Sequence, residues 1–218
     1  MSKNPNIEYS EFLDYFIEDL DSSILEKINL NLIFLIGEIG KLATISDKYL
    51  DFLIKTYYSS DRWIRDEIIQ SIRKISKTTT FGEEITRLVG NGINDDYLPI
   101  RINALKTVLN LDEIPQFIYR NVFLALNSKD KELKTACADI LKKHLSGYNQ
   151  LFKLLENLEN YKVLKPYAIR SLLLMIFNSP FNLEPFLNNI SDSDWEREYK
   201  ELFIKEIEIY ERILLKNI

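Results

Sequence analysis

Four basic residues recur at a nearly constant interval, and cations spaced in this way could bind phosphate groups or an acidic partner. Arg65, Arg101, Lys134 and Arg170 stand 36, 33 and 36 positions apart, and each is followed by small or apolar residues at helical spacing. This period lies in the range of helical-repeat proteins. The repeat predicts a stack of units with a long exposed face, which suits binding better than catalysis.

A second set of residues lies on one face of the helix expected around Trp63. Trp63, Glu67, Gln70 and Lys74 fall within an arc of about 60° at helical spacing. One and two repeats further on, the corresponding positions carry Asn103, Lys106, Asp139 and Lys143. An exposed tryptophan is a favoured anchor of protein interfaces, so together these residues are the predicted partner-binding surface. The alternatives are a solvated helix face and, for Trp63, packing against a neighbouring repeat.

The residue types that most enzymes need are scarce in this chain. His144 is the single histidine and Cys137 the single cysteine. A histidine-rich metal site, a relay built on two histidines and an internal disulfide are therefore excluded. We expect Cys137 on the apolar side of its helix, as a core thiol. The prediction is a protein with no catalytic residues, no metal and no cofactor.

Composition indicates a helical protein with a sizeable core. The chain has 218 residues, of which 46% are hydrophobic, and only six are glycine and six proline. It has too few turn residues for an all-β fold, and its many Leu, Lys and Glu residues suit helices. The net charge of −5 argues against a dedicated nucleic-acid binder, because phosphate is held mainly by excess Lys and Arg. The middle of the chain is basic, however, and would attract an acidic partner.

Apolar periodicity and turn residues predict five antiparallel helix pairs followed by a final helix. Ser, Asp and Asn stand where N-caps are needed, and Pro99, Pro115 and Pro166 fall near expected helix starts. A turn or short helix is expected at 179–194 and a final helix at 195–216. The predicted pairs are 10–20 with 23–43, 47–58 with 61–77, 82–90 with 96–110, 113–127 with 129–145, and 148–158 with 162–178.

These repeats resemble the HEAT-repeat family over about residues 10–178. The family's unit is two antiparallel helices with a basic residue near the start of the second, and its usual ending is similar to Leu35-Ile-Gly-Glu-Ile-Gly40. Asp95, six residues before Arg101, matches the acidic position of the ladder that joins HEAT repeats. The resemblance implies an all-α, right-handed α-solenoid of about five HEAT-like helix pairs with a C-terminal capping helix. It also implies that the second helices line a concave surface and that the basic residues tie repeats together.

The whole chain, 1–218, is expected to form a single α-solenoid domain, with helix pairs at 10–178 and a capping segment at 179–218. The apolar side of the final helix either folds back over the fifth pair or meets the same helix of a second chain. We expect a monomer, with a homodimer through this helix as the alternative. The first residues do not resemble a signal peptide, and the longest apolar run, 172–177, is far shorter than the roughly 20 residues of a membrane span. We therefore expect a cytoplasmic protein.

Taken together, these patterns predict a non-catalytic scaffold or adaptor that binds another protein on the concave face of the array. The alternative is a nucleic-acid-binding protein that uses its basic second helices. Repeat-type alkylpurine DNA glycosylases have a similar length and helix-pair repeats, but their characteristic Trp-Asp-Leu-Val-Asp run is absent here. A third possibility is a subunit similar to the HEAT-like phycobilin lyases, which act with a partner chain.

Overall fold

The computed structural model describes residues 9–180 and 182–216, and these residues form helices joined by short turns, with no strand among them. The predicted all-α class is confirmed. Contacts between the helices divide the chain into two compact units, Met1–Asp112 and Glu113–Ile218. Each unit is described by itself.

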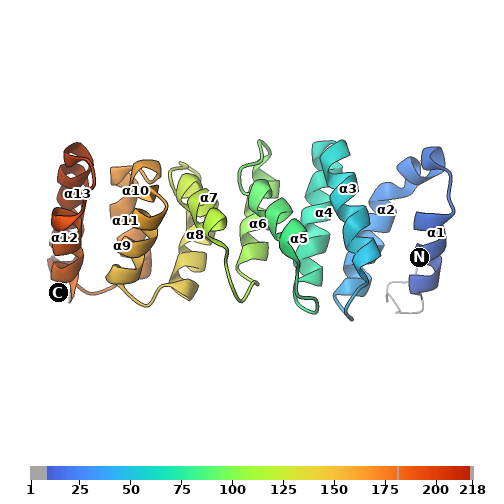
Figure 1. Cartoon of the computed structure of the whole chain (residues 1–218), viewed down its shortest axis with the longest axis horizontal. Helices are drawn as coiled ribbons and strands as arrows, with labels where there is room; N and C mark the ends of the chain where they lie inside the picture. The colour runs from blue at the N-terminus through green and yellow to red at the C-terminus, as the bar shows by residue number, and fades with distance from the viewer. Residues whose placement is uncertain (1–8, 181, 217–218) are drawn as a thin grey trace. The chain divides into compact units, whose positions relative to one another are not determined.

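In the first unit three helices pack in succession, α2 against α4 and α4 against α6 (Figure 1). Helix α1 packs on α2, and α3 contacts both α4 and α5, which in turn packs on α6. Each helix therefore has neighbours that lie close to it in sequence, as in stacked helix pairs. The helices are α1 (Ser10–Glu18), α2 (Ser22–Gly40), α3 (Asp47–Ser59), α4 (Arg62–Ile75), α5 (Glu83–Gly92) and α6 (Leu98–Val108).

Two glycines allow α2 and α4 to approach closely. A Cβ atom at Gly37 would lie 2.6 Å from Ser71 Oγ and 2.9 Å from Ser71 Cα, and one at Gly40 would lie 2.4 Å from Ile75 Cγ1. The Ser71 hydroxyl donates a hydrogen bond of 2.9 Å to the carbonyl oxygen of Ile33 across the same contact. Gly37 and Gly40 therefore fix the spacing between α2 and α4, the helix that carries four of the eight predicted partner-binding residues.

The second unit is built around α8, α11 and α13, which pack in that order. Helix α7 contacts α8 and α10, while α9 contacts α10 and α12, and α12 contacts α13. Cys137 is fully buried in α8, as expected of a core thiol. The helices are α7 (Gln116–Leu126), α8 (Lys131–His144), α9 (Tyr148–Asn157), α10 (Asn160–Val163), α11 (Pro166–Ile176), α12 (Leu183–Asp192) and α13 (Arg197–Leu215).

The single helix expected at 162–178 is wrong, because the chain divides there into α10 and α11. Leu164 and Lys165 are extended, with ψ of 110° and 139°, and α11 begins at Pro166. The ring of a proline disfavours helical geometry at the residue before it, so Pro166 ends one helix and starts another.

The last part of the chain covers α11. The segment expected to be a turn or short helix contains α12, a helix of ten residues, and the final helix is α13. Phe203, Ile207 and Tyr210 of α13 are fully buried, and α13 packs on α11, where Ala168 and Leu172 are also buried. The final helix therefore folds back inside its own unit. Among the described residues, no helix combines the length and apolar character of a membrane span.

Candidate functional site

The four predicted residues of α4 lie on one helix and differ in exposure. Trp63 is 59% exposed, whereas Glu67, Gln70 and Lys74 are half-buried. Asp61 caps the start of this helix, since its Oδ1 accepts hydrogen bonds from the backbone N–H groups of Trp63 (2.9 Å) and Ile64 (3.1 Å). The cap fixes the position from which the Trp63 side chain leaves the helix. Of the four predicted residues on α4, Trp63 is therefore the exposed one.

Trp63 is held by two neighbours at the surface. Its ring meets that of Tyr97 edge-on, with centroids 5.7 Å apart. The Arg62 guanidinium lies 5.0 Å from the Trp63 ring centroid and 5.4 Å from that of Tyr97. Edge-to-face and cation–π contacts of this kind each contribute roughly 0.5–1 kcal/mol at an exposed site. The indole is therefore oriented although most of its surface meets solvent.

The basic residue Arg65 joins α4 to the turn before α6. It donates from Nε to Asp95 Oδ2 and from Nη2 to Asp95 Oδ1, both at 3.1 Å. It also donates to Asp96 Oδ1 at 3.2 Å and to the carbonyl oxygen of Ser60, in the preceding turn, at 3.2 Å. Such a bidentate pair fixes geometry as well as charge. All of these contacts lie within the first unit, so Arg65 connects one helix pair to the next.

The same contacts lower the pKa of the Asp95 carboxylate. Burial alone would raise its pKa, but the hydrogen bonds from Arg65 and from the Tyr97 backbone N–H outweigh burial and lower it. Nearby, burial raises the pKa of Tyr57 to about 12, and the negative charge of Asp95 acts in the same direction. Asp95 is thus an ionised anchor at neutral pH, and Tyr57 is a neutral phenol beside it.

A hydrogen-bonded amide network continues the surface from α4 to α6. Asp66 accepts from Gln70 Nε2 through Oδ2 and from Asn103 Nδ2 through Oδ1, each at 3.0 Å. Asn103 Oδ1 in turn accepts from Arg73 Nη1 at 3.2 Å. The two predicted residues Gln70 and Asn103 are therefore joined through a single carboxylate, and their side chains are held in place.

The other end of α4 carries a lysine between two carboxylates. Lys74 Nζ lies 2.9 Å from Glu38 Oε1 and 3.9 Å from Glu67 Oε1, and 4.6 Å from the centroid of the half-exposed Phe34 ring. Glu67 Oε1 is buried and has no hydrogen-bond partner among the described residues. Burial raises the pKa of Glu67, and the Lys74 charge only partly offsets that effect. The α2–α4 part of the surface is thus a compact charged cluster beside an exposed aromatic ring.

The remaining predicted residues fall on both units. Asn103 and Lys106 lie on α6 and are half-buried, so they share the first unit with the four residues of α4. Asp139 and Lys143 lie on α8 in the second unit, and both are exposed. The structure brings together the residues of α4 and α6, and we build the candidate surface from these. We call the exposed side of Arg62, Trp63 and Tyr97, with the adjoining Asp66–Asn103 network, the α4–α6 face.

Sequence analysis missed three residues of this face, Arg62, Asp66 and Tyr97. Arg62 and Asp66 lie beside the predicted stripe on α4, outside its arc of about 60° at helical spacing. Tyr97 precedes α6 and becomes a neighbour of Trp63 only through the packing of α4 on α6. A weak local signal existed for Arg62, because a cation directly beside an exposed tryptophan often stacks on it.

The other basic residues of the repeat also bond within their units. Arg101 donates from Nε to the carbonyl oxygen of Ile93 at 2.9 Å, in the turn before its helix. Arg170 Nε on α11 lies 3.6 Å from Glu206 Oε2 on α13. The side chains of three of the four repeat cations therefore have protein partners, while the Lys134 ammonium has no hydrogen bond or ion pair among the described residues.

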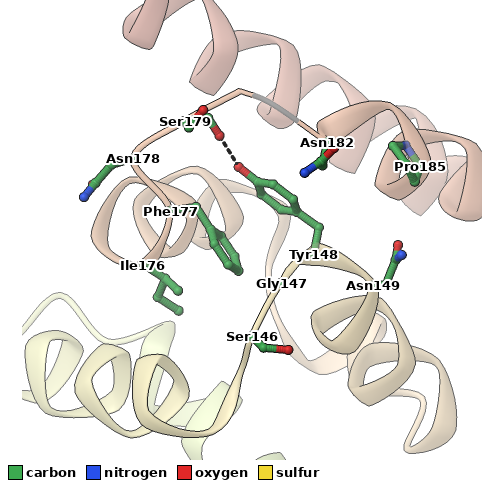
Figure 2. Close-up of a pocket in the computed structure, with 10 residues that line it drawn as sticks. All are labelled: Ser146, Gly147, Tyr148, Asn149, Ile176, Phe177, Asn178, Ser179, Asn182 and Pro185. Atoms are coloured by element: carbon green, nitrogen blue, oxygen red, sulfur yellow. Dashed lines mark hydrogen bonds between the residues drawn. The ribbon is translucent and has the colours of Figure 1, made fainter.

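The second unit holds an open pocket of about 630 Å³ between α9, α11 and the start of α12 (Figure 2). Its ten lining residues bear amide, hydroxyl and apolar side chains, and no carboxylate, imidazole, thiol or cation occurs among them. Figure 2 shows Asn182 pointing toward the Tyr148 ring and Asn149 on the same side, while Asn178 points away. The lining residues are Ser146, Gly147, Tyr148, Asn149, Ile176, Phe177, Asn178, Ser179, Asn182 and Pro185.

Tyr148 is the titratable residue of this pocket, and its hydroxyl is already engaged. It donates to the Ser179 carbonyl oxygen at 2.6 Å and lies 2.9 Å from the hydroxyl of Tyr210, which donates to the Phe177 carbonyl oxygen at 3.0 Å. Burial raises the pKa of Tyr148, although the hydrogen bond with Tyr210 acts against that rise. A bonded, neutral phenol is a poor general base, so this pocket is suited to neutral polar groups and offers no acid–base pair.

No group of three or more potential metal ligands is found within residues 9–180 and 182–216. In comparisons with protein-family models, with curated proteins and with solved structures, nothing matches this chain. The function of this chain is therefore inferred from its own residues and their contacts.

Proposed function

We propose that this chain is a HEAT-like α-solenoid protein that binds a partner protein through the α4–α6 face and has no catalytic activity of its own. The succession of α2, α4 and α6 in the first unit, and of α8, α11 and α13 in the second, supports the solenoid. In such an array the second helix of each pair lines one face. The α4–α6 face lies on these second helices.

The exposed and oriented Trp63 carries the proposal. Burying a large indole surface supplies much of the free energy of an interface, and ordering a free side chain normally offsets part of it. Here Arg62 and Tyr97 already hold the ring, so less entropy remains to be lost when a partner binds. The hydrogen-bonded Asp66–Asn103 network beside it resembles the polar rim that surrounds the anchors of protein interfaces.

The contacts of the repeat cations favour a protein partner over a nucleic acid. Nucleic-acid binding needs several Lys and Arg side chains with free donors along one path. Arg65, Arg101 and Arg170 instead bond to carboxylates or carbonyl oxygens of their own unit. We therefore propose a protein partner, and the experiment that follows distinguishes it from nucleic-acid binding.

The test is an affinity capture from lysate of the source organism, with the full chain as bait. The same capture is carried out with two variants of the chain. Trp63→Ala should lose the specific partner, whereas Tyr58→Ala should retain it. Tyr58 is a matched control because it is 62% exposed and lies on α3, outside the α4–α6 face. Both variants should stay folded and unfold cooperatively within a few degrees of the parent chain, because the exposed contacts they lose are weak.

The captured complex then separates the two classes of partner. A protein interface anchored by Trp63 should lose about 2 kcal/mol or more of binding free energy in the Trp63→Ala variant and respond weakly to salt. Binding that collapses with rising salt and is abolished by nuclease would replace the proposal with nucleic-acid binding. Equal capture by the parent and the Trp63→Ala variant would place the partner elsewhere on the chain.

A further inference from the structure

Arg62 and Arg65 lie on the same helix, α4, but differ in their partners. Its guanidinium lies over the rings of Trp63 and Tyr97, and it forms no hydrogen bond or ion pair among the described residues. Arg65, one turn further along α4, bonds to two carboxylates and a carbonyl oxygen. The Arg65 guanidinium is thus bonded within its own unit, whereas the exposed Arg62 guanidinium has its N–H donors available to a partner.

The acidic residues around Arg62 are already engaged. Asp61 accepts the backbone N–H groups at the start of α4, and Asp95 and Asp96 both bond to Arg65. The planar guanidinium carries parallel N–H donors that match a carboxylate in a bidentate geometry. The two rings restrict its plane, which lowers the entropy lost when an anion binds.

We propose that Arg62 binds the carboxylate of an aspartate or glutamate in the partner protein, while an apolar residue next to it packs on Trp63. This assignment rests on the proposed function of the α4–α6 face. The recognised element is a short segment with an acidic residue beside an apolar one. The carboxylate is favoured over a phosphate because Asp61, Asp95 and Asp96 all lie close in the chain to this face. Their charges oppose a dianion more strongly than a monoanion.

The probe is a library of random linear peptides displayed on phage and selected on the immobilised full chain. Selected peptides are synthesised with their acidic residue intact and with Glu→Gln or Asp→Asn in its place. Their affinities are measured for the parent chain and for Arg62→Ala, Arg62→Lys, Trp63→Ala and Arg87→Ala. Arg87 is the control, since it is an exposed arginine on α5 that pairs with Glu83 of its own helix.

We expect enriched peptides in which Asp or Glu adjoins an apolar residue. Arg62→Ala and the peptide amide should each weaken binding by about tenfold or more, the effect of losing a charge-assisted hydrogen bond. The two changes together should cost no more than either alone, and Arg62→Lys should restore only part of the affinity. Arg87→Ala should leave the affinity unchanged. Cooperative unfolding of every variant within a few degrees of the parent chain establishes that the fold is intact.

Three outcomes would overturn the inference. Peptides that need Trp63 but bind equally well to the Arg62→Ala variant would contradict the role assigned to Arg62 and leave the proposed function of the α4–α6 face unaffected. Peptides that need neither residue, or the absence of any enrichment, would remove both proposals. A phosphoserine peptide that binds through Arg62 more tightly than its glutamate counterpart would replace the carboxylate by a phosphate.

Discussion

The Arg65 guanidinium and the Asp95 carboxylate form two parallel hydrogen bonds of 3.1 Å across a separation of 30 residues. Their side chains are 23% and 9% exposed, so solvent screens the pair only in part. The contact joins the helix that carries Trp63 to the turn that positions Tyr97. Two residues that are distant in sequence thus hold the two halves of the aromatic cluster together.

Replacing Asp95 by Asn should destabilise the first unit by about 1.5–3 kcal/mol at pH 7, because charge-assisted hydrogen bonds are lost from a mostly buried site. Asp96→Asn is the matched control, since that side chain is 91% exposed and makes one contact with Arg65. The control should change the free energy of unfolding by less than about 0.5 kcal/mol. Urea denaturation followed by circular dichroism measures both values, and equal losses would contradict the role assigned to Asp95.

The same pair gives a pH dependence of defined sign. The pKa of Asp95 is lowered from its ordinary value of 3.8, so the folded state favours the ionised carboxylate. The stabilisation is present above pH 3.8 and is lost as the pH falls through the lower folded pKa. The free energy of unfolding should therefore fall less steeply with acid for Asp95→Asn than for the parent chain. Parallel acid curves would contradict the shift.

Glu67→Gln should stabilise the first unit at neutral pH by a few tenths to about 1 kcal/mol, because burial penalises the ionised side chain. Burial raises the pKa of Glu67 above its ordinary value of 4.5, so the folded state favours the protonated side chain. The contribution of this preference to the free energy of unfolding is full below pH 4.5 and is lost as the pH rises through the folded pKa. The advantage of the glutamine variant should shrink as the pH is lowered. Glu84→Gln, at an exposed position of α5, is the control. A glutamine variant that is less stable at pH 7 would show that the Lys74 contact dominates.

Gly37→Ala should destabilise the α2–α4 contact by about 1–3 kcal/mol, since the added methyl group meets the backbone and hydroxyl of Ser71. This loss should exceed the gain of up to about 1 kcal/mol that alanine brings to a helix. Gly82→Ala is the control because a Cβ there meets nothing within 4 Å. Thermal unfolding compares the two variants, and a Gly37→Ala variant as stable as its control would contradict the close packing.

Tyr210→Phe should destabilise the second unit by about 1 kcal/mol, because the Phe177 carbonyl oxygen loses its donor from α13. The hydroxyl groups of Tyr148 and Tyr210 share two protons among three short oxygen–oxygen contacts. Removing the Tyr210 hydroxyl therefore changes the remaining hydrogen bonds of Tyr148 as well. Tyr199→Phe is the control, since that hydroxyl forms no hydrogen bond among the described residues. Chemical denaturation that cannot separate the two variants would show that the hydroxyl cluster adds no stability.

Much of the secondary structure could be predicted from local sequence. The caps at Asp61 and Asp130 accept backbone N–H groups where the expected helices begin, and Cys137 is buried as its position on the apolar side predicts. Helix periodicity and capping depend on residues within one or two turns of each other, which the sequence displays directly. The break before Pro166 also had a local cause, although the length of the predicted helix concealed it.

The sequence by itself determined that this protein is helical, that its cations repeat at a nearly fixed interval and that Trp63 lies on one face with Gln70 and Lys74. Tertiary structure decided that Arg65 bonds to Asp95, that Arg62 has no counter-ion within residues 9–180 and 182–216, and that Tyr97 reaches the Trp63 ring. The physical reason is the range of the interactions involved. Periodicity assigns a residue to a face of its own helix, but its partners depend on how the neighbouring helix packs. Here that packing depends on contacts between α4 and α6 such as that of Asp66 with Asn103.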